Sequence, residues 1–253
     1  MKRLENRVAV VTGSSRGIGA AIVKAFASEG AAVAVHGRDE AAISAVRKEI
    51  ASAGGRAIAV GADVTKLSEV DDMRARVEAE LGPVDIVVAN AGGNYGPVGP
   101  VEETTEENWR ACVEGNLTAT FFTIKSFLPG MKERRRGDII TISSAAARRP
   151  HARSPVAYAA AKAGLELLTQ DAAAQAGPFG IRVNCIAPET ILTARNQARI
   201  PEATKAELVE AHPLKRLGTP EDVARAAVFL ASEDAGWITG VILDIAGGAV
   251  MVR

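Results

Sequence analysis

The sequence is poor in cysteine and in aromatic residues, and it has no apolar run near the roughly 20 residues that a membrane span needs. Its two cysteines, Cys112 and Cys185, lack CxxC or metal-ligand spacing, which argues against a disulfide framework and a zinc module. The first six residues are rich in charge and the apolar run after them is short, unlike a signal peptide. We therefore expect a cytoplasmic protein with two reduced core thiols.

An excess of either charge is also lacking. Thirty Lys and Arg residues balance thirty Asp and Glu residues, so neither nucleic acid nor an anionic membrane is favoured as a partner. The three histidines show no ligand spacing, and we expect no metal site. Hydrophobic residues make up 47% of the 253 residues, enough for the core of one α/β domain spanning residues 1–253.

Short apolar segments alternate with helical patterns along the whole chain. The predicted strands are 8–11, 32–35, 58–61, 86–89, 139–142, 181–186 and 239–245, and a long helix is predicted over 105–127. This alternation predicts a doubly wound parallel sheet of the Rossmann type, whose ligands lie at the carboxyl edges of the strands. Residues 192–213 are polar and look loose, and we expect them to form a substrate lid.

A glycine-rich turn follows the first strand and opens a helix. Gly13, Gly17 and Gly19 have the spacing G-x-x-x-G-x-G, which differs from the common G-x-G-x-x-G fingerprint. A strand, a glycine turn and a helix in this order point free backbone N–H groups at a phosphate. The turn predicts nucleotide binding, and a purely structural turn is the alternative.

The second predicted strand ends in His36-Gly37-Arg38-Asp39, without the carboxylate that holds the ribose 2′-hydroxyl of NAD. Arg38 suits a 2′-phosphate, and Arg16 in the glycine turn could add a second contact. A charge-assisted hydrogen bond contributes about 1.5–3 kcal/mol, so NADP is favoured over NAD. In the alternative interpretation Arg38 is a solvated loop residue, and Asp39 could cap the next helix.

Tyr158 and Lys162 stand at i and i+4 of a predicted helix and therefore share one face. A phenol with a pKa near 10 is a poor acid–base group at neutral pH. One ammonium about 4 Å away contributes about 4 kcal/mol at an effective dielectric near 20, enough to lower the pKa of Tyr158 by two to three units if desolvation does not cancel it. The two residues could also share a helix face by chance. Likewise, Asn116 in the long helix could be an ordinary core asparagine with satisfied hydrogen bonds.

These pieces in this order resemble the short-chain dehydrogenase/reductase family, over nearly the whole chain. The matching motifs are Thr12-Gly13-x-x-x-Gly17-Ile18-Gly19, Asp63-Val64, Asn90-Ala91-Gly92, Asn116, Ser144, Tyr158-x-x-x-Lys162 and Pro188-x-x-Ile191-x-Thr193. The segment 216–224 is also similar to that of bacterial-type members related to 3-oxoacyl carrier-protein reductases. The resemblance implies an oxidoreductase that transfers a hydride between NADP(H) and a carbonyl or secondary alcohol, and commonly a homotetramer.

The resemblance also implies roles for single residues. Tyr158 would be the general acid or base, Lys162 would lower its pKa and hold the nicotinamide ribose, and Ser144 would bind the reacting oxygen. Asn116 would position a water in a proton relay. The expected cofactor-binding residues are Gly13, Ser15, Arg16, Gly17, Ile18, Gly19, Arg38, Asp63, Val64, Asn90, Ala91, Gly92, Tyr158, Lys162, Ile191 and Thr193.

Several positions depart from the family pattern. Ala89 replaces an Asn, Glu189 replaces the Gly after Pro188, and Ala246 replaces an Asp. The interval between Ser144 and Tyr158 is one residue longer than in carrier-protein reductases, so Ser143 is a second candidate for the catalytic serine. That interval also carries Arg148, Arg149, His151 and Arg153, which favour an acidic or acyl-carrier-linked substrate unless they form a solvated loop.

Two other functions stay open at this point. A nucleotide-binding regulator or scaffold could keep the fold without turnover. The intact set of Asn116, Ser144, Tyr158 and Lys162 argues against this alternative, while Glu189 leaves it open. An NAD-dependent alcohol dehydrogenase of the same fold would follow if Arg38 is only a solvated residue.

Overall fold

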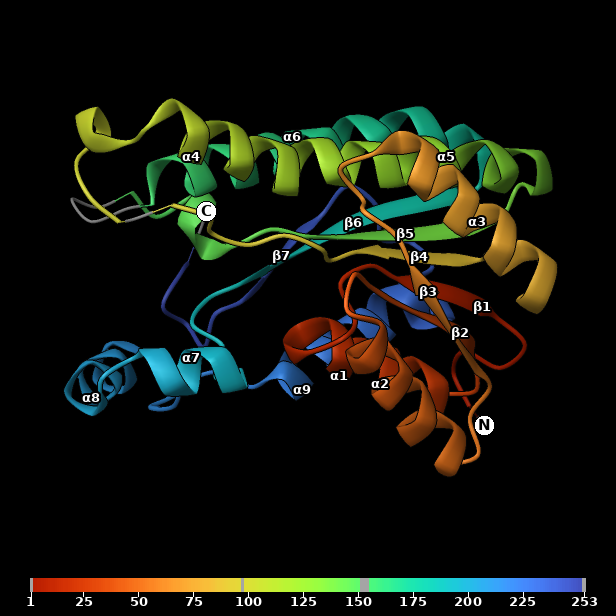
Figure 1. Cartoon of the computed structure of the whole chain (residues 1–253), viewed down its shortest axis with the longest axis horizontal. Helices are drawn as coiled ribbons and strands as arrows, with labels where there is room; N and C mark the ends of the chain where they lie inside the picture. The colour runs from red at the N-terminus through yellow and green to blue at the C-terminus, as the bar shows by residue number, and fades with distance from the viewer. Residues whose placement is uncertain (1, 97, 151–154, 252–253) are drawn as a thin grey trace.

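The computed structural model describes residues 2–96, 98–150 and 155–251, and its centre is a seven-stranded parallel sheet (Figure 1). The strand order is β3-β2-β1-β4-β5-β6-β7. The strands are β1 (Val8–Val11), β2 (Ala32–Gly37), β3 (Ala57–Gly61), β4 (Ile86–Ala89), β5 (Gly137–Ile142), β6 (Ile181–Pro188) and β7 (Ile242–Ile245). The prediction of a doubly wound parallel sheet is confirmed, and the last strand is shorter than predicted because the chain bends at Gly240 and joins the ladder only from Ile242.

Helices cover both faces of the sheet (Figure 1). One face carries α1 (Gly17–Ser28), α2 (Glu40–Ser52) and α9 (Pro220–Ala231), and the other carries α3 (Leu67–Leu81), α5 (Ala119–Arg134) and α6 (Val156–Ala176). The remaining helices are α4 (Glu106–Cys112), α7 (Ala194–Arg199) and α8 (Glu202–Ala211), and short 3₁₀ turns occupy Val101–Glu103, Ala145–Ala147, Gly177–Phe179 and Glu233–Ala235. No helix in these described ranges is both long and apolar enough to cross a membrane.

Burial on both faces explains why the central strands are apolar at every position. In β1, Ala9 and Val11 enter the core beneath α1 and α9, whereas Val8 and Val10 enter the core beneath α3 and α5. The β-branched side chains fit the pleated surface, and a sheet that is covered on both sides has no solvated face to require alternation. The order of the strands in the sheet reverses between β1 and β4, and ligands of such sheets bind at the carboxyl edge beside this reversal.

The amino edge of the sheet is closed by a buried ion cluster. Arg7 and Arg182 each place a guanidinium nitrogen 2.6 Å from the Asp138 carboxylate. These residues precede or open β1, β6 and β5, so the cluster ties three strands together at the end that faces away from the predicted ligand edge.

Two predicted elements differ from the structure. The helix predicted over 105–127 is α4, a π-helical turn (Val113–Thr118) and α5. In this turn the Asn116 amide donates to the carbonyls of Gly93, in the loop after β4, and of Cys112, the last residue of α4. The predicted loose lid at 192–213 contains two helices, α7 and α8, which extend from the body of the molecule at the lower left of Figure 1.

Candidate active site

The glycine turn after β1 is packed tightly against the segment that follows β4. Gly13 has φ +64°, and a Cβ there would lie 2.9 Å from the Ala91 Cα. A Cβ on Gly19 would lie 2.4 Å from the Gly13 carbonyl oxygen. The Asn90 side-chain amide donates to the carbonyls of Thr12 and Gly13 at 2.9 and 3.1 Å. Asn90 and Ala91 therefore pack against the side of the turn that faces β4, and only glycine fits at Gly13 and Gly19.

His36 also holds this turn, and the sequence analysis missed it. The Gly13 N–H donates to Nδ1 at 3.0 Å, and Nε2 lies 3.0 Å from the Ala62 carbonyl oxygen. Because a carbonyl only accepts, Nε2 carries the hydrogen and the ring is neutral. Burial lowers the pKa of His36 accordingly. The available signal was a histidine in an otherwise apolar, two-face-buried strand, rather than its spacing to other histidines.

The outer surface of the turn fits a dinucleotide phosphate. Helix α1 begins at Gly17 without a side-chain cap and without an acidic residue in its first turn, so its positive end is uncompensated. Ser15 is partly exposed and Arg16 is exposed, while Ile18 packs against the core. A Cβ on Gly17 would lie 3.3 Å from the Thr193 side chain. The turn and the segment after β6 therefore approach each other across the carboxyl edge.

Exposed cations lie at the end of β2 and in the glycine turn. Arg38 is exposed, and no ion pair of Arg38 is found among residues 2–96, 98–150 and 155–251. Arg16 approaches Asp39 to 3.9 Å, and Asp39 caps α2 by accepting the Ala42 N–H, as expected. Next to β3, hydrogen bonds from Thr65 and then the charge of Arg38 lower the pKa of Asp63, and Val64 is buried.

Ser144, Tyr158 and Lys162 meet at the same edge. Strand β5 ends just before Ser144, and α6 presents Tyr158 and Lys162 one turn apart. The Ser144 side chain lies close enough to the Tyr158 hydroxyl to lower its pKa. The Lys162 Nζ donates to the Ile142 carbonyl at 2.6 Å and lies 5.6 Å from the centre of the Tyr158 ring. The predicted constellation is thus assembled by one strand end and one helix.

The expected lowering of the Tyr158 pKa is not found. Burial raises the pKa of Tyr158, and the nearby Ser144 side chain opposes this increase. Lys162 is itself fully enclosed, and burial lowers its pKa to about 8. The lowering required that desolvation not cancel the attraction, and this condition is not met: both groups are buried, and the Lys162 ammonium is bound to the Ile142 carbonyl.

The second serine candidate points elsewhere. The Ser143 hydroxyl donates to Glu166 at 2.8 Å and lies 3.3 Å from the Lys162 carbonyl oxygen, inside the core. Ser143 is therefore occupied structurally, which leaves Ser144 beside Tyr158.

Asn116 holds the loop after β4. Its amide nitrogen donates to the carbonyls of Gly93 and Cys112 at 2.9 and 2.8 Å, and its oxygen accepts the Gly93 N–H at 3.0 Å. A Cβ on Gly92 would lie 2.4 Å from that oxygen. The asparagine is fully buried and satisfied, and it sits in a π-helical turn, a feature frequent at functional sites.

The basic segment after Ser144 differs from the prediction. Arg148 forms ion pairs with Glu166 at 3.1 Å and with both carboxylate oxygens of Asp244 at 2.5 and 3.1 Å. It is largely enclosed, so it is not a free cation for an acidic substrate. Arg149 is half exposed and lies 3.9 Å from Glu189. His151 and Arg153 lie outside the described residues.

Tyr95 is a further residue that the sequence analysis missed. Its exposed fraction is 47%, its ring edge packs on Gly115, and it contributes to the raised pKa of Tyr158. Ile191, by contrast, is buried and pairs its backbone with Gly218, while Thr193 caps α7. Tyr95 and Thr193 thus approach the site from the loop after β4 and from the lid, respectively.

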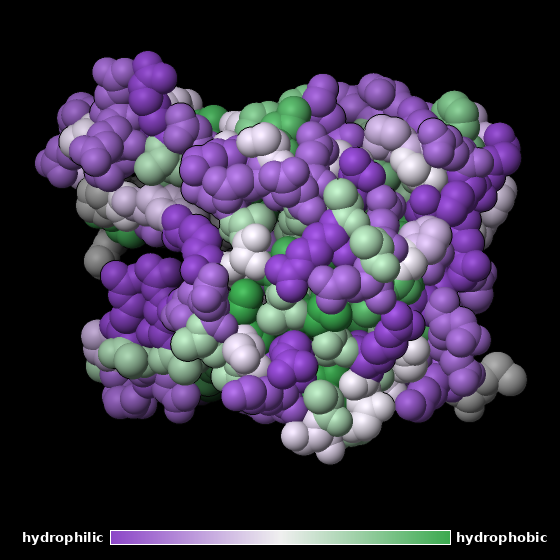
Figure 2. Space-filling view, turned by 45° about the vertical axis from the view of Figure 1, so that its right-hand side comes forward, coloured by the Kyte–Doolittle hydropathy of each residue, from purple (hydrophilic) through white to green (hydrophobic). Residues whose placement is uncertain are grey.

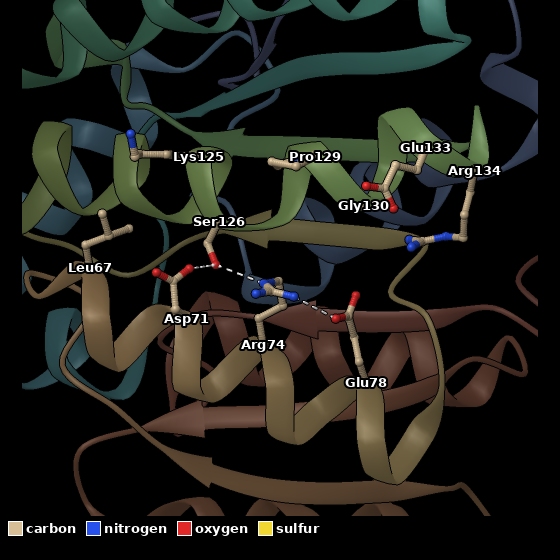
Figure 3. A pocket seen from close by; sticks show the side chains of 10 residues that line it. All are labelled: Leu67, Asp71, Arg74, Glu78, Lys125, Ser126, Pro129, Gly130, Glu133 and Arg134. Atoms are coloured by element: carbon tan, nitrogen blue, oxygen red, sulfur yellow. Dashed lines mark hydrogen bonds and ion pairs between the residues drawn. The ribbon is translucent and has the colours of Figure 1, made fainter.

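A separate groove of about 370 Å³ lies between α3 and α5 (Figure 3). Two pairs of its lining residues interact: Ser126 donates to Asp71 at 2.6 Å, and Arg74 pairs with Glu78 at 2.9 Å. No predicted site residue lines it, and we do not assign it a ligand. The surface seen in Figure 2 is mainly hydrophilic and is hollowed at its left edge. Among the residues in place, no group of three or more His, Cys, Asp or Glu side chains is arranged for a metal ion.

The fold and the edge cluster define a Rossmann-type α/β protein. The family described as "Enoyl-(Acyl carrier protein) reductase" matches residues 13–250. The chain is 37% identical over 263 aligned positions to cyclohexanol dehydrogenase of Rhodococcus sp. (strain TK6), covering 97% of this chain and 96% of that protein.

Two solved structures superpose on the chain over nearly its whole length. One is a 7α-hydroxysteroid dehydrogenase complexed with NADH and 7-oxo glycochenodeoxycholic acid, with a TM-score of 0.93, 36% identity, and coverage of 99% of this chain and 96% of that one. The other is a 3-oxoacyl-[acyl-carrier protein] reductase with bound NAD from Brucella melitensis, with a TM-score of 0.89, 36% identity, and coverage of 99% and 95%. The chain belongs to the short-chain dehydrogenase/reductase family and is an oxidoreductase acting on CH–OH and C=O groups.

Proposed function

We propose that the protein transfers a hydride between NADP(H) and a carbonyl or secondary alcohol, with Tyr158 as general acid or base. The observation that carries the proposal is that Ser144, at the end of β5, lies beside Tyr158, with Lys162 one turn further along α6. The uncapped start of α1 and the glycine turn lie at the same edge of the sheet. These groups can therefore act on one bound substrate beside a dinucleotide.

The protein supplies the proton and the orientation, and a bound nicotinamide supplies or accepts the hydride. In reduction, the Tyr158 hydroxyl would give its proton to the carbonyl oxygen, and in oxidation the phenolate would take it back. Ser144 would donate a hydrogen bond to that oxygen as negative charge develops on it. The raised pKa of Tyr158 keeps the proton on the phenol at neutral pH, which suits the reductive direction.

The test of catalysis is Tyr158→Phe, which removes the hydroxyl and keeps the ring. We expect turnover with NADPH and carbonyl substrates to fall by at least about 10³-fold, while the cofactor Kd stays within about threefold. A retained turnover would reject Tyr158 as the acid–base group. If neither the wild type nor the variant turns over any substrate although both bind the cofactor, a nucleotide-binding regulator or scaffold becomes the better assignment.

The preference for NADP rests on Arg38 and Arg16. Both guanidinium groups are exposed at the end of β2 and the glycine turn, where a 2′-phosphate would lie, and Asp39 is engaged in capping α2. We expect NADPH to bind at least about tenfold more tightly than NADH, and Arg38→Ala to remove most of that difference. Equal or tighter binding of NADH would assign an NAD-dependent alcohol dehydrogenase instead, in line with the relatives named for NADH and NAD complexes.

An acidic or acyl-carrier-linked substrate is the finer part of the proposal. Arg149 supports it as a half-exposed cation of the segment after Ser144, whereas Arg148 is held by Glu166 and Asp244. An Arg149→Glu variant should raise the KM for a carboxylate-bearing or carrier-linked ketone but not for a neutral ketone of similar size. Equal changes in KM for both ketones would contradict the hypothesis that the substrate is acidic or linked to an acyl carrier.

The proposed assembly is a homotetramer. Trp109, Phe121 and Leu167 are exposed by 44%, 44% and 60% on the helices that flank Asn116 and Tyr158, and Trp237 beside the last strand is fully exposed. Large apolar side chains in such numbers are typical of an interface between subunits. We also keep the cytoplasm as the proposed compartment, since both cysteines are free and buried.

A further inference from the structure

Glu189 lies where three segments around the substrate side of the site come together. It follows β6 directly, and its N–H donates to the Ile245 carbonyl of β7 at 3.1 Å. Its carboxylate contacts His212, at the end of α8, and approaches Arg149, in the segment after Ser144. The carboxylate also accepts the N–H of Thr190. One side chain thus joins the strand edge, the lid and the loop before Tyr158.

The contact between Glu189 and His212 has a defined hydrogen pattern. The His212 side chain is buried, with Nδ1 2.6 Å from the Leu208 carbonyl oxygen and Nε2 2.8 Å from the Glu189 carboxylate. The carbonyl can only accept, so Nδ1 carries a hydrogen. Two lone pairs facing each other would repel, so a second hydrogen must lie between Nε2 and Glu189. The pair is therefore bound by a shared, charge-assisted hydrogen bond.

This contact fixes the end of the lid at the same edge where the lid begins. At its start, the Leu192 N–H donates to the Gly218 carbonyl at 2.8 Å, and Thr193 caps α7 beside Gly17. At its end, His212 binds Glu189, and the Leu214 N–H donates to the Gly247 carbonyl at 3.2 Å. Helices α7 and α8 have no buried residues of their own. Their position therefore depends on these two ends rather than on a core.

We propose that Glu189 is a positioning residue for the substrate. Glu189 holds the lid over the site through His212 and orients Arg149 toward the substrate. The role toward the substrate rests on the proposed function, whereas the contact between Glu189 and His212 does not depend on the reaction. Glu189 does not touch the reacting groups in this arrangement, since its oxygens are occupied by His212, Thr190 and Arg149.

The test compares Glu189→Ala, His212→Phe and the double variant with the wild type. Hydrogen exchange of the backbone amides in 192–213 should be about tenfold faster in each variant, because the lid loses one anchored end. With NADPH and a carbonyl substrate, the substrate KM should rise about tenfold while kcat stays within about twofold. The double variant should be no worse than the more severe single variant, because both remove the same contact.

Glu210→Ala is the matched control. Glu210 pairs with Lys215 at 3.1 Å in the same turn, but that pair is exposed, so neither amide exchange nor KM should change. His212→Phe leaves a buried carboxylate without its partner and could unfold; Glu189→Ala leaves a neutral imidazole with its bond to Leu208, and it decides the test alone in that case.

Unchanged amide exchange in Glu189→Ala would contradict the claim that the contact between Glu189 and His212 anchors the lid. Effects of the single variants that add in the double variant would contradict it as well. Faster exchange with an unchanged KM would overturn the positioning role and leave only a structural contact. If the wild type shows no turnover with any carbonyl, the proposed function fails, but the exchange rates still decide whether Glu189 holds the lid.

Discussion

His36 has only one arrangement of its ring hydrogen that satisfies both neighbours. Nδ1 accepts from Gly13 and Nε2 donates to Ala62, so a second proton would break the hydrogen bond to the glycine turn. Burial disfavours the charged form as well and lowers the pKa of the ring. The state of one histidine in β2 is thereby linked to the shape of the turn that is proposed to bind phosphate.

The lowered pKa of His36 gives a pH dependence with a definite sign. Below pH 6.5 the unfolded chain takes up a proton that folded His36 refuses, so stability is lost as the pH falls below that value towards the lower pKa of the folded protein. Relative to His36→Leu, the free energy of unfolding of the wild type should decrease by up to about 2 kcal/mol between pH 7 and pH 5. Urea titrations at several pH values measure this, and a constant difference would contradict it.

The lowered pKa of Lys162 predicts a dependence of the free energy of unfolding on pH at alkaline pH. Its folded pKa of about 8 is below the 10.5 of the unfolded chain, so the unfolded chain binds more protons between these values. The free energy of unfolding of the wild type relative to Lys162→Met should therefore rise with pH across this window, by about 3 kcal/mol in total. Chemical denaturation from pH 7 to 10 tests the slope; a difference that stays constant with pH would show that Lys162 keeps its charge when folded.

At the scale of elements, the glycine turn and α1 form a unit with the end of β4. Thr12 accepts the N–H groups of Asn90 and Ala91 at 3.0 Å each, and Asn90 returns hydrogen bonds to the carbonyls of the turn. The turn is therefore rigid before any ligand binds, which lowers the entropic cost of holding a phosphate.

Gly19→Ala should disrupt this unit. The new methyl group would lie 2.4 Å from the Gly13 carbonyl oxygen and 2.5 Å from the Asn90 amide nitrogen, so the backbone must shift. We expect a loss of stability of about 1–3 kcal/mol and a cofactor Kd at least about tenfold higher. Gly177→Ala is the control, since nothing lies within 4 Å of a Cβ there and φ is −50°. Thermal unfolding and NADPH titration distinguish them, and equal effects would argue against a special role for Gly19.

At the scale of the whole molecule, the helix layer of α4, α5 and α6 is the face with exposed apolar side chains. The rings of Phe121 and Phe122 are tilted against each other with their centres 5.8 Å apart, and Leu167 is exposed on α6, which packs beside α5 in Figure 1. Since α6 also carries Tyr158 and Lys162, a partner on this face would steady the helix that holds the proposed acid–base pair.

Assembly can be tested on this face directly. Phe121→Asp combined with Leu167→Asp should convert a tetramer into smaller species, because two charges would be buried in the interface. Light scattering coupled to size-exclusion chromatography gives the mass. Lys48→Asp, an exposed substitution on α2, should leave the mass unchanged. A wild type that is monomeric at micromolar concentration would reject the homotetramer.

Much of the fold could be predicted because it is encoded locally. The bounds of β1 and β4 are those read from the apolar runs 8–11 and 86–89, and the start of α9 at Pro220 follows from Thr219 as cap and proline in the first turn. The spacing of Tyr158 and Lys162 also needs only a helix. Such features depend on neighbours within a few residues, so the sequence by itself determined them.

What the tertiary structure decided are the contacts between residues that are far apart in the chain. Arg148 forms an ion pair with Asp244, 96 positions away. His212 contacts Glu189 only because the end of the lid returns to the end of β6. The pKa of Lys162 depends on burial against β5, and His36 reaches the glycine turn across neighbouring strands. Burial and long-range pairing set the charge and proton state of a side chain, and neither is a property of its local sequence.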